Sequence, residues 1–188
     1  MSTPSKRTVY KAGKHTITAA GVVFYTRSGD KMHLLLQDYK DSNLGFQDFG
    51  GCMEPDDINP FMTALRETVE ECNASIFNDK CTTKDEYLAK RDNEILMFES
   101  YVKQTRFKGY IRSYVISDLK YMLFLVHLDG KFSKKLTPQK FGDYEFHEGH
   151  KRTVQWVCAD DIILGNCKLH PRLYSLPEIL YYNFIKKI

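Results

Sequence analysis

The stretch that decides the fold is GGCMEPDDINPFMTALRETVEECNA, residues 50–74. Asn59 followed by Pro60 is typical of a helix start, because an asparagine side chain caps the first turn and proline fits the first helical position. Asn73 is a residue that tolerates the left-handed conformation in which helices often end. Between them, apolar residues recur at three- and four-residue spacing and predict one buried stripe: Met62, Leu65, Val69, Cys72 and Ile76.

The face of this helix opposite the stripe carries three carboxylates. At about 100° per residue, Glu67, Glu70 and Glu71 lie together, with Arg66 as the neighbouring cation. Such a face is also typical of an ordinary solvated helix surface. Where it is not solvated, the repulsion is relieved by a divalent metal ion or by shifted pKa values. Carboxylate oxygens suit Mg²⁺ or Mn²⁺, and these ions suit phosphoryl chemistry.

The stretch resembles the Nudix box of the Nudix hydrolase superfamily. In that box a glycine precedes a glutamate, and Arg-Glu-x-x-Glu-Glu and a glycine follow. Here Gly51 and the segment Arg66–Glu71 match in register, and Gly50-Gly51-x-x-Glu54 also matches common family usage. The sequence departs from the pattern in three ways: Asp57 replaces the first glutamate, one extra residue separates it from Arg66, and Asn73 replaces the last glycine.

The resemblance extends over residues 15–164 through apolar segments at 20–23, 34–36 and 154–157. It implies an α+β fold, a Nudix-like α/β/α sandwich with a mixed β-sheet between helices. We expect a single domain over 1–188, with an insertion at 78–109 and a C-terminal helix at 176–188. Residues 1–15 resemble a frayed leader without a secretory signal.

Propensity and alternation predict the remaining elements. Strands are expected at 15–25 and 32–37, which form a hairpin, at 46–49 leading into Gly50-Gly51, at 110–116 and 121–128, which pair, and at 153–158. A second, weaker helix is expected within 83–101.

The resemblance also implies roles for the residues of the box. It makes Glu67, Glu70 and Glu71 ligands of Mg²⁺ or Mn²⁺, with the Gly50 carbonyl completing the coordination. Arg66 would hold Glu67 or Glu70 in position. Catalysis would be attack of water on a diphosphate phosphorus.

A further acidic residue from a later loop is expected to act as metal ligand or general base. Glu148 is the preferred candidate because Gly149 follows it, and Glu145 is the substitute. The general base is left open among Glu67, Glu148 and Glu145. For substrate binding, Phe46, Tyr25 and Phe49 near the cleft are candidates to stack a base, with Glu54 as a further contact; core packing is the more usual role and is expected for at least two of these rings.

The sequence indicates the substrate less clearly than it indicates the Nudix-like motif. The first hypothesis is hydrolysis of a nucleoside diphosphate linked to another moiety, or of a modified nucleoside triphosphate. The alternatives are an mRNA-decapping or diphosphoinositol polyphosphate hydrolase, and a catalytically silent module that binds nucleotide or protein. Cations interleaved with aromatics at 103–112 are compatible with capped RNA as a partner.

Composition narrows the remaining classes. The chain has 188 residues, a formal net charge of +3 and 13% aromatic residues, so disordered and fibrous classes are excluded. No apolar run reaches the ~18 residues of a membrane span. Five cysteines without a CxxC pair disfavour a disulfide framework and favour a cytoplasmic or nuclear location. No specific protein partner is readable, and a homodimer stays open.

Overall fold

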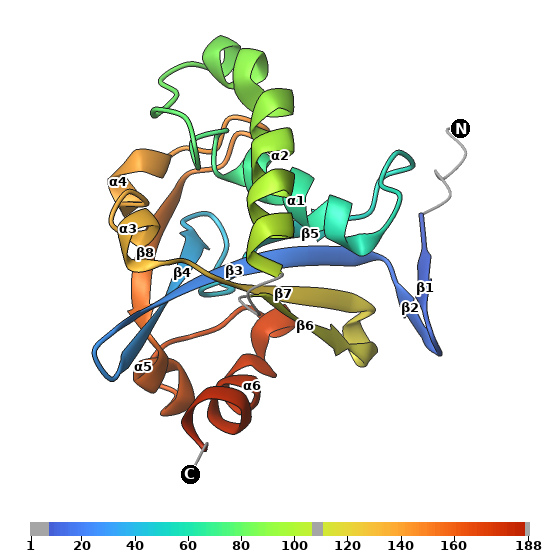
Figure 1. Cartoon of the computed structure of the whole chain (residues 1–188), viewed down its shortest axis with the longest axis vertical. Coiled ribbons are helices and arrows are strands. Elements are labelled where there is room, and N and C mark those ends of the chain that lie inside the picture. The colour runs from blue at the N-terminus through green and yellow to red at the C-terminus, as the bar shows by residue number, and fades with distance from the viewer. Residues whose placement is uncertain (1–7, 107–110, 187–188) are drawn as a thin grey trace.

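The computed structural model describes residues 8–106 and 111–186. Six strands form the central mixed sheet in the order β6-β7-β3-β4-β8, with β5 paired to β3. A separate two-stranded hairpin, β1 and β2, lies at the N-terminal side (Figure 1). The strands are β1 (Tyr10–Ala12), β2 (His15–Ile17), β3 (Ala19–Ser28), β4 (Lys31–Tyr39), β5 (Phe49–Cys52), β6 (Ile111–Ile116), β7 (Tyr121–His127) and β8 (Arg152–Cys158).

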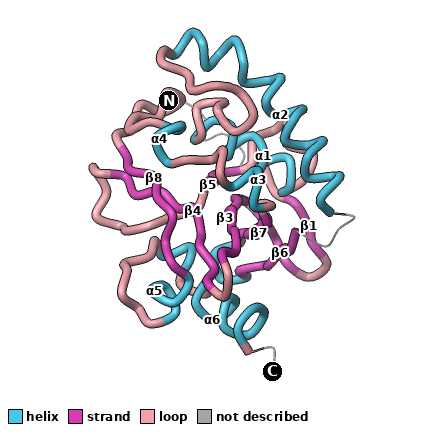
Figure 2. The backbone as a smooth tube through the Cα atoms, turned by 60° about the vertical axis from the view of Figure 1, so that its left-hand side comes forward, coloured by secondary structure: helices cyan, strands magenta, loops and turns pink. Residues whose placement is uncertain are grey.

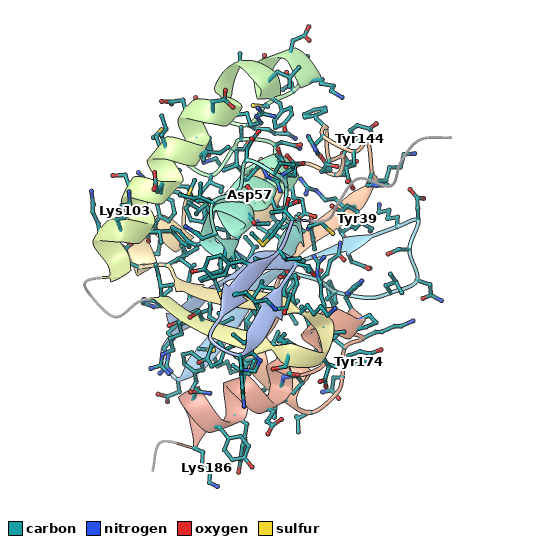
Figure 3. All side chains as sticks on the ribbon, turned by 90° about the vertical axis from the view of Figure 1, so that its right-hand side faces the viewer. Tyr39, Asp57, Lys103, Tyr144, Tyr174 and Lys186 are labelled. Carbon is teal, nitrogen blue, oxygen red and sulfur yellow. The ribbon has the colours of Figure 1, made fainter. Side chains whose placement is uncertain are left out.

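Helices cover both faces of this sheet, which confirms the predicted α/β/α sandwich (Figures 1 and 2). One layer contains α1 (Pro60–Glu71), α2 (Lys84–Arg106), α3 (Gly130–Ser133) and α4 (Pro138–Phe141), and the other contains α5 (Ala159–Ile163) and α6 (Leu176–Leu180). Short 3₁₀ turns occupy Ser117–Leu119 and Pro171–Leu173, and a π-helical turn covers Tyr181–Ile185. Figure 3 shows the two layers through Lys103 on α2 and Tyr174 on the opposite side of the sheet.

Helix α1 forms as its sequence predicts. The Asn59 side chain accepts a hydrogen bond from the Met62 amide at 3.0 Å, and Pro60 occupies the first turn. The apolar stripe is buried against β3 and β5. The helix ends before Asn73, whose φ of 54° is the predicted left-handed conformation.

Strand β3 organises the sheet, because one of its edges pairs with two different strands. Its first half pairs with β5, its second half pairs with β4, and β7 runs parallel along the other edge. Alternate side chains of β3 therefore enter different cores. Phe24 packs in the α1 and α2 core, whereas its neighbour Tyr25 packs in the α5 and α6 core.

Several predicted boundaries were wrong. The strand expected at 15–25 is two strands, because residue 18 interrupts it between β2 and β3. The strand expected at 46–49 begins only at Phe49 and includes both glycines, since residues 46 and 47 make isolated bridges instead. Part of the expected N-terminal leader, Tyr10–Ala12, forms β1.

The remaining elements follow the predicted order. β6 and β7 pair antiparallel as expected. The second helix is present as α2 and is longer than predicted, 23 residues. The C-terminal helix begins at Leu176 as predicted but is α-helical only to Leu180. Residues 107–110 of the basic and aromatic segment, and residues 1–7 and 187–188, lie outside the described residues. Within the described ranges, no helix is long and apolar enough to cross a membrane.

Candidate active site

The carboxylates of α1 face a cleft of about 510 Å³ between β5, α1 and the loops at 41–47 and 145–150. Seven carboxylates, two guanidinium groups and two imidazoles line it. Of the predicted site residues it contains Gly50, Glu54, Arg66, Glu67, Glu70, Glu71 and Glu148, and with them Glu145. The charged lining is thus strongly acidic.

Glu71 is held by two donors from the sheet. One carboxylate oxygen accepts a hydrogen bond from the Gly50 amide at 2.6 Å, and the other accepts one from the Tyr39 hydroxyl at 2.9 Å. Burial, reinforced by the nearby Glu67 and opposed by Arg172, raises the pKa of Glu71 to about 8. The side chain therefore holds a proton near neutral pH unless a cation approaches it.

Glu67 lies directly against Gly51. A Cβ atom at position 51 would be 2.5 Å from Glu67 Oε2, so only glycine leaves room for this carboxylate. Arg66 Nη2 is 3.0 Å from Glu67 Oε1. Burial, together with the charges of Glu70 and Glu148, raises the pKa of Glu67 to about 7 despite this arginine. Gly51 thus makes space for a carboxylate side chain.

Arg66 connects the start of the box to its helix. Its guanidinium donates to Asp57 through Nε at 3.2 Å and Nη2 at 3.0 Å, and to Glu70 Oε2 through Nη1 at 2.8 Å. It also donates to the Cys52 carbonyl at 2.9 Å. The predicted contacts of Arg66 with Glu67 and Glu70 are both present. Charge-assisted bonds of this kind hold carboxylates in fixed positions.

Asp57, which replaces the glutamate of the Nudix pattern, supports Arg66 from the loop before α1 (Figure 3). Its carboxylate also accepts a hydrogen bond from the Glu54 amide at 2.9 Å. Burial alone would raise the pKa of Asp57, but the hydrogen bonds from Arg66 and from this amide outweigh it, and the pKa is lowered. Asp57 is therefore a permanently charged partner of Arg66.

Glu70 also receives contacts from outside the box. Arg91 of α2 approaches its Oε1 at 3.7 Å, and Nε2 of His147 approaches its Oε2 at 3.8 Å. The Tyr87 hydroxyl, also on α2, lies 3.3 Å from Nδ1 of the same histidine. Burial nonetheless raises the pKa of Glu70. The segment expected as an insertion thus contacts residues that line the cleft.

Asn73 fixes the loop that carries the later acidic residues. Its amide nitrogen donates to the carbonyls of Phe141 and Tyr144 at 3.0 and 2.7 Å, and its oxygen accepts from the Phe146 amide at 2.9 Å. The end of α1 and the loop at 141–146 are therefore joined by three side-chain hydrogen bonds.

The two candidates for the later acid differ in their surroundings. Glu145 is buried, and its carboxylate accepts backbone hydrogen bonds from His147 and Glu148, so it stabilises the loop. The Glu148 side chain is 69% exposed and has His150 Nε2 at 3.4 Å. Both line the cleft, and Glu148 is the freer side chain.

A second guanidinium reaches the cleft from the C-terminal part of the chain. Arg172 Nε donates to Asp48 Oδ1 at 2.5 Å and Nη2 donates to the Asp48 carbonyl at 2.9 Å. The other carboxylate oxygen accepts the Tyr121 hydroxyl at 2.5 Å. A Cβ atom at Gly50 or Gly21 would collide with this hydroxyl, so both glycines make space for the network.

Two predicted substrate contacts lie elsewhere. Tyr25 is buried in the α5 and α6 core, in edge contact with Phe184. Phe46 packs against the same core, and Phe49 is fully buried in the other. The assignment of Tyr25 and Phe46 to substrate binding was wrong, and the core-packing role holds instead. Strand alternation turns Tyr25 and Phe49 into the cores, whereas Phe46 makes an isolated bridge with Leu169. Glu54, in contrast, lines the cleft with a 58% exposed side chain.

The sequence did not single out Tyr39, Arg172, His147 or His150 as residues of the box region. Tyr39 ends β4 and Arg172 lies about 100 residues after α1, so no local spacing connects them to it. His147 and His150 lie close to Glu148 in the sequence, and this proximity could have indicated that they line the same cleft.

The donor set fits a divalent cation, although no ready-made ligand cage is present. Among the residues that the structure describes, no group of three His, Cys, Asp or Glu side chains is already arranged around a common point. The carboxylates of Glu67 and Glu71 line the cleft, where seven carboxylates outnumber the two guanidinium groups. Hard oxygen ligands with unneutralised charge are what Mg²⁺ and Mn²⁺ bind.

Comparisons with known proteins give little further information. No protein-family model matches the sequence, and no curated protein matches it. Among solved structures, the chain is similar to the "Crystal Structure of a C. elegans Ap4A Hydrolase Binary Complex", with a TM-score of 0.43 and 15% sequence identity over 87% of this chain and 92% of that chain. A similarity at this level carries no argument about chemistry.

Proposed function

We propose that the protein is a divalent-cation-dependent hydrolase of the Nudix class, which cleaves a diphosphate bond in a small nucleotide derivative. The observation that carries this proposal is the lining of the cleft, where seven carboxylates stand against two guanidinium groups. A polyanionic substrate would be repelled from such a surface unless cations enter with it. The segment Arg66–Glu71, which carries three of these carboxylates, resembles the Nudix pattern and supports the proposal.

Glu67, Glu70 and Glu71, with Glu148 and the Gly50 carbonyl, would hold the cation. When bound, a divalent ion supplies positive charge that neutralises the diphosphate and makes water more acidic. Arg66 keeps Glu67 and Glu70 oriented toward the cleft through the contacts described above.

Glu67 is the best-placed proton acceptor for an attacking water. Its pKa of about 7 is close to the pH at which a general base works well. Glu148 is the second candidate because its carboxylate is exposed in the same cleft and acts electrostatically on Glu67. Glu145 is less suited, since its oxygens are occupied by backbone amides.

The cleft favours a small nucleotide derivative over the alternatives. A polyphosphorylated inositol requires several cations, and no lysine in the described ranges lines this cleft. Lys103, a basic residue of the segment expected to contact capped RNA, pairs with Glu99 on α2. We therefore rank mRNA decapping and diphosphoinositol hydrolysis below nucleotide hydrolysis.

The test is release of phosphate or nucleotide from a panel with Mg²⁺ at slightly alkaline pH. The panel contains modified nucleoside triphosphates, ADP-ribose, dinucleoside polyphosphates, capped RNA and a diphosphoinositol phosphate. The double variant Glu70→Gln/Glu71→Gln is the blank, and Glu178→Gln, an exposed glutamate of α6, is the matched control. We expect one substrate to be turned over by the parent and by Glu178→Gln but not by the blank.

A silent binding module would give a different pattern. In that case the parent protein and the blank would be equally inactive on the whole panel while calorimetry still detected nucleotide binding. That result would overturn the hydrolase proposal.

A further inference from the structure

We propose that Arg172 binds a phosphate group of the substrate, and that the buried pair Asp48 and Tyr121 holds it in place for this task. The inference rests on the proposed function, since it assigns a phosphate subsite to the same cleft. Arg172 lies outside the Nudix motif and reaches the cleft from the 3₁₀ turn at Pro171–Leu173.

Arg172 retains hydrogen-bonding capacity after its contacts with the protein. A guanidinium has five N–H donors. The contacts with Asp48 use Nε and one donor of Nη2. The side chain is 16% exposed and lines the cleft. Its remaining donors are of the kind that binds phosphate oxygens in a fixed fork.

The other cations of the cleft are less suited to a substrate phosphate. Arg66 faces Glu54, Asp57, Glu67 and Glu70, so its charge is shared among four carboxylates. His147 and His150 are partly exposed imidazoles whose charge depends on pH. Arg172 has one carboxylate partner in an ion pair, Asp48, and stays charged at every working pH.

Asp48 and Tyr121 fix the position of Arg172. Asp48 is fully buried, and its second oxygen accepts the Tyr121 hydroxyl. The Tyr121 ring lies under the guanidinium, with 5.6 Å between Cζ of Arg172 and the ring centroid. A cation held in this way loses little freedom on binding an anion, which favours affinity.

Arg172 is also close enough to Glu71 to act on it. Its positive charge lowers the pKa of that glutamate more than any other neighbouring charge does. A phosphate bound at Arg172 would therefore lie beside the carboxylates that hold the cation, which is where a diphosphate has to be for hydrolysis.

The alternative is a purely structural role, in which Arg172 only attaches the C-terminal layer to the sheet. The two roles differ in what they predict for ligand binding. A structural role alters thermal stability and leaves phosphate affinity unchanged in any variant that still folds. If Arg172 binds phosphate, the affinity for phosphate falls more in a variant that loses both the charge and the N–H donors than in one that keeps the charge.

The test is calorimetric titration of ADP, and separately of inorganic pyrophosphate, in Mg²⁺, with Tm measured for each protein. We expect Arg172→Gln to weaken both affinities at least tenfold and Arg172→Lys to weaken them less, because lysine keeps the charge without the fork. Arg27→Gln, an exposed arginine of β3, is the matched control and keeps the parent affinity. Asp48→Asn keeps Arg172 but loosens it and gives an intermediate loss.

If a folded Arg172→Gln or Arg172→Lys protein binds both ligands as the parent does, with an unchanged KM on any substrate found, the inference is overturned. Should Arg172→Gln not fold, the Lys variant decides. A parent that binds pyrophosphate through Arg172 but hydrolyses nothing overturns the proposed function and leaves the subsite standing. A parent that binds neither ligand overturns the subsite.

Discussion

Asn73 stands at the position where the resemblance of the sequence to the Nudix box implies a glycine, and the structure shows what asparagine adds. Glycine would supply only the left-handed conformation. Asparagine adopts it at φ 54° and also joins α1 to the loop at 141–146. The replacement thus connects the helix of Glu70 and Glu71 to the loop before Glu148.

We predict that Asn73→Gly lowers the free energy of unfolding by about 1–3 kcal/mol. Three side-chain hydrogen bonds are lost, at roughly 1 kcal/mol each, and relief of backbone strain returns a part. Chemical denaturation measures the change. Lys120→Gly is the control, because Lys120 is exposed, has φ 52° and makes the same gain in backbone freedom without losing such bonds. Equal effects of the two substitutions would contradict the role assigned to the amide.

Gly51 and Gly50 make a second residue-level prediction. A Cβ atom at Gly51 meets the end of the flexible Glu67 side chain, so Gly51→Ala displaces that carboxylate while the fold persists. We expect Gly51→Ala to lose at least tenfold in kcat with a small change in Tm. Gly50→Ala is the comparison, because its Cβ atom meets backbone atoms of residues 20 and 21 and should lower Tm clearly. A Gly51→Ala enzyme with normal kcat would show that Glu67 is not needed where it lies.

Among the helices and strands, α2 contacts residues of the cleft although it lies outside the segment 50–74. Glu94 in its middle is fully buried and accepts hydrogen bonds from the Phe77 amide and from Asn78, which fixes α2 to the segment after α1. Tyr87 and Arg91, one and two turns from its start, then approach His147 and Glu70. The helix therefore orients groups of the cleft from outside the box.

We predict that Arg91→Gln lowers kcat about 3- to 10-fold while Tm changes little. The ion pair with Glu70 is long, 3.7 Å, and the arginine side chain is 35% exposed, so its contribution to folding is within ~0.5 kcal/mol. Lys84→Gln at the start of the same helix is the control and should leave kcat unchanged. If both variants keep full activity, α2 does not position Glu70.

Across the whole molecule, the buried acids of the cleft make stability depend on pH. Glu67 and Glu71 have pKa values of about 7 and about 8, raised from 4.5. Between pH 4.5 and these raised pKa values, the unfolded chain has released protons that the folded chain still holds. The free energy of unfolding therefore falls as pH rises through this range. The slope is at most about 1.4 kcal/mol per pH unit for each group.

We therefore expect the Tm of the metal-free protein to fall from pH 5 to pH 8, measured by scanning calorimetry in chelator. Glu67→Gln and Glu71→Gln should flatten the curve and raise Tm at pH 8. Mg²⁺ should also raise Tm at pH 8, because it binds the charged carboxylates of the folded state. Parallel curves for parent and variants would refute the assigned pKa shifts.

The sequence was informative where structure is local. Asn59, Pro60, the apolar stripe and Asn73 predicted α1 and its acidic face within the chain segment that forms them. It was uninformative where segments meet from a distance. The approach of Tyr39, Asp48 and Arg172 depends on sheet register and on the C-terminal layer, which no spacing encodes.

The core that Tyr25 enters could not be read from the sequence alone. On a strand buried on both faces, side chains alternate between two cores, and hydrophobicity alone does not tell the faces apart. Its neighbour Phe24 enters the core beneath α1, so Tyr25 must enter the other. Knowing the register of one β3 residue would have assigned the rest.

The network around the Tyr121 hydroxyl has a consequence for the history of the sequence. Positions 21 and 50 are confined to glycine by that hydroxyl and by neighbouring backbone atoms, and Asp48 is held by its two partners. Substitutions at these positions and at Arg172 are therefore expected to occur together in evolution and not one at a time. Lineages that lost the arginine should also have lost the aspartate, since a buried carboxylate without its cation is costly.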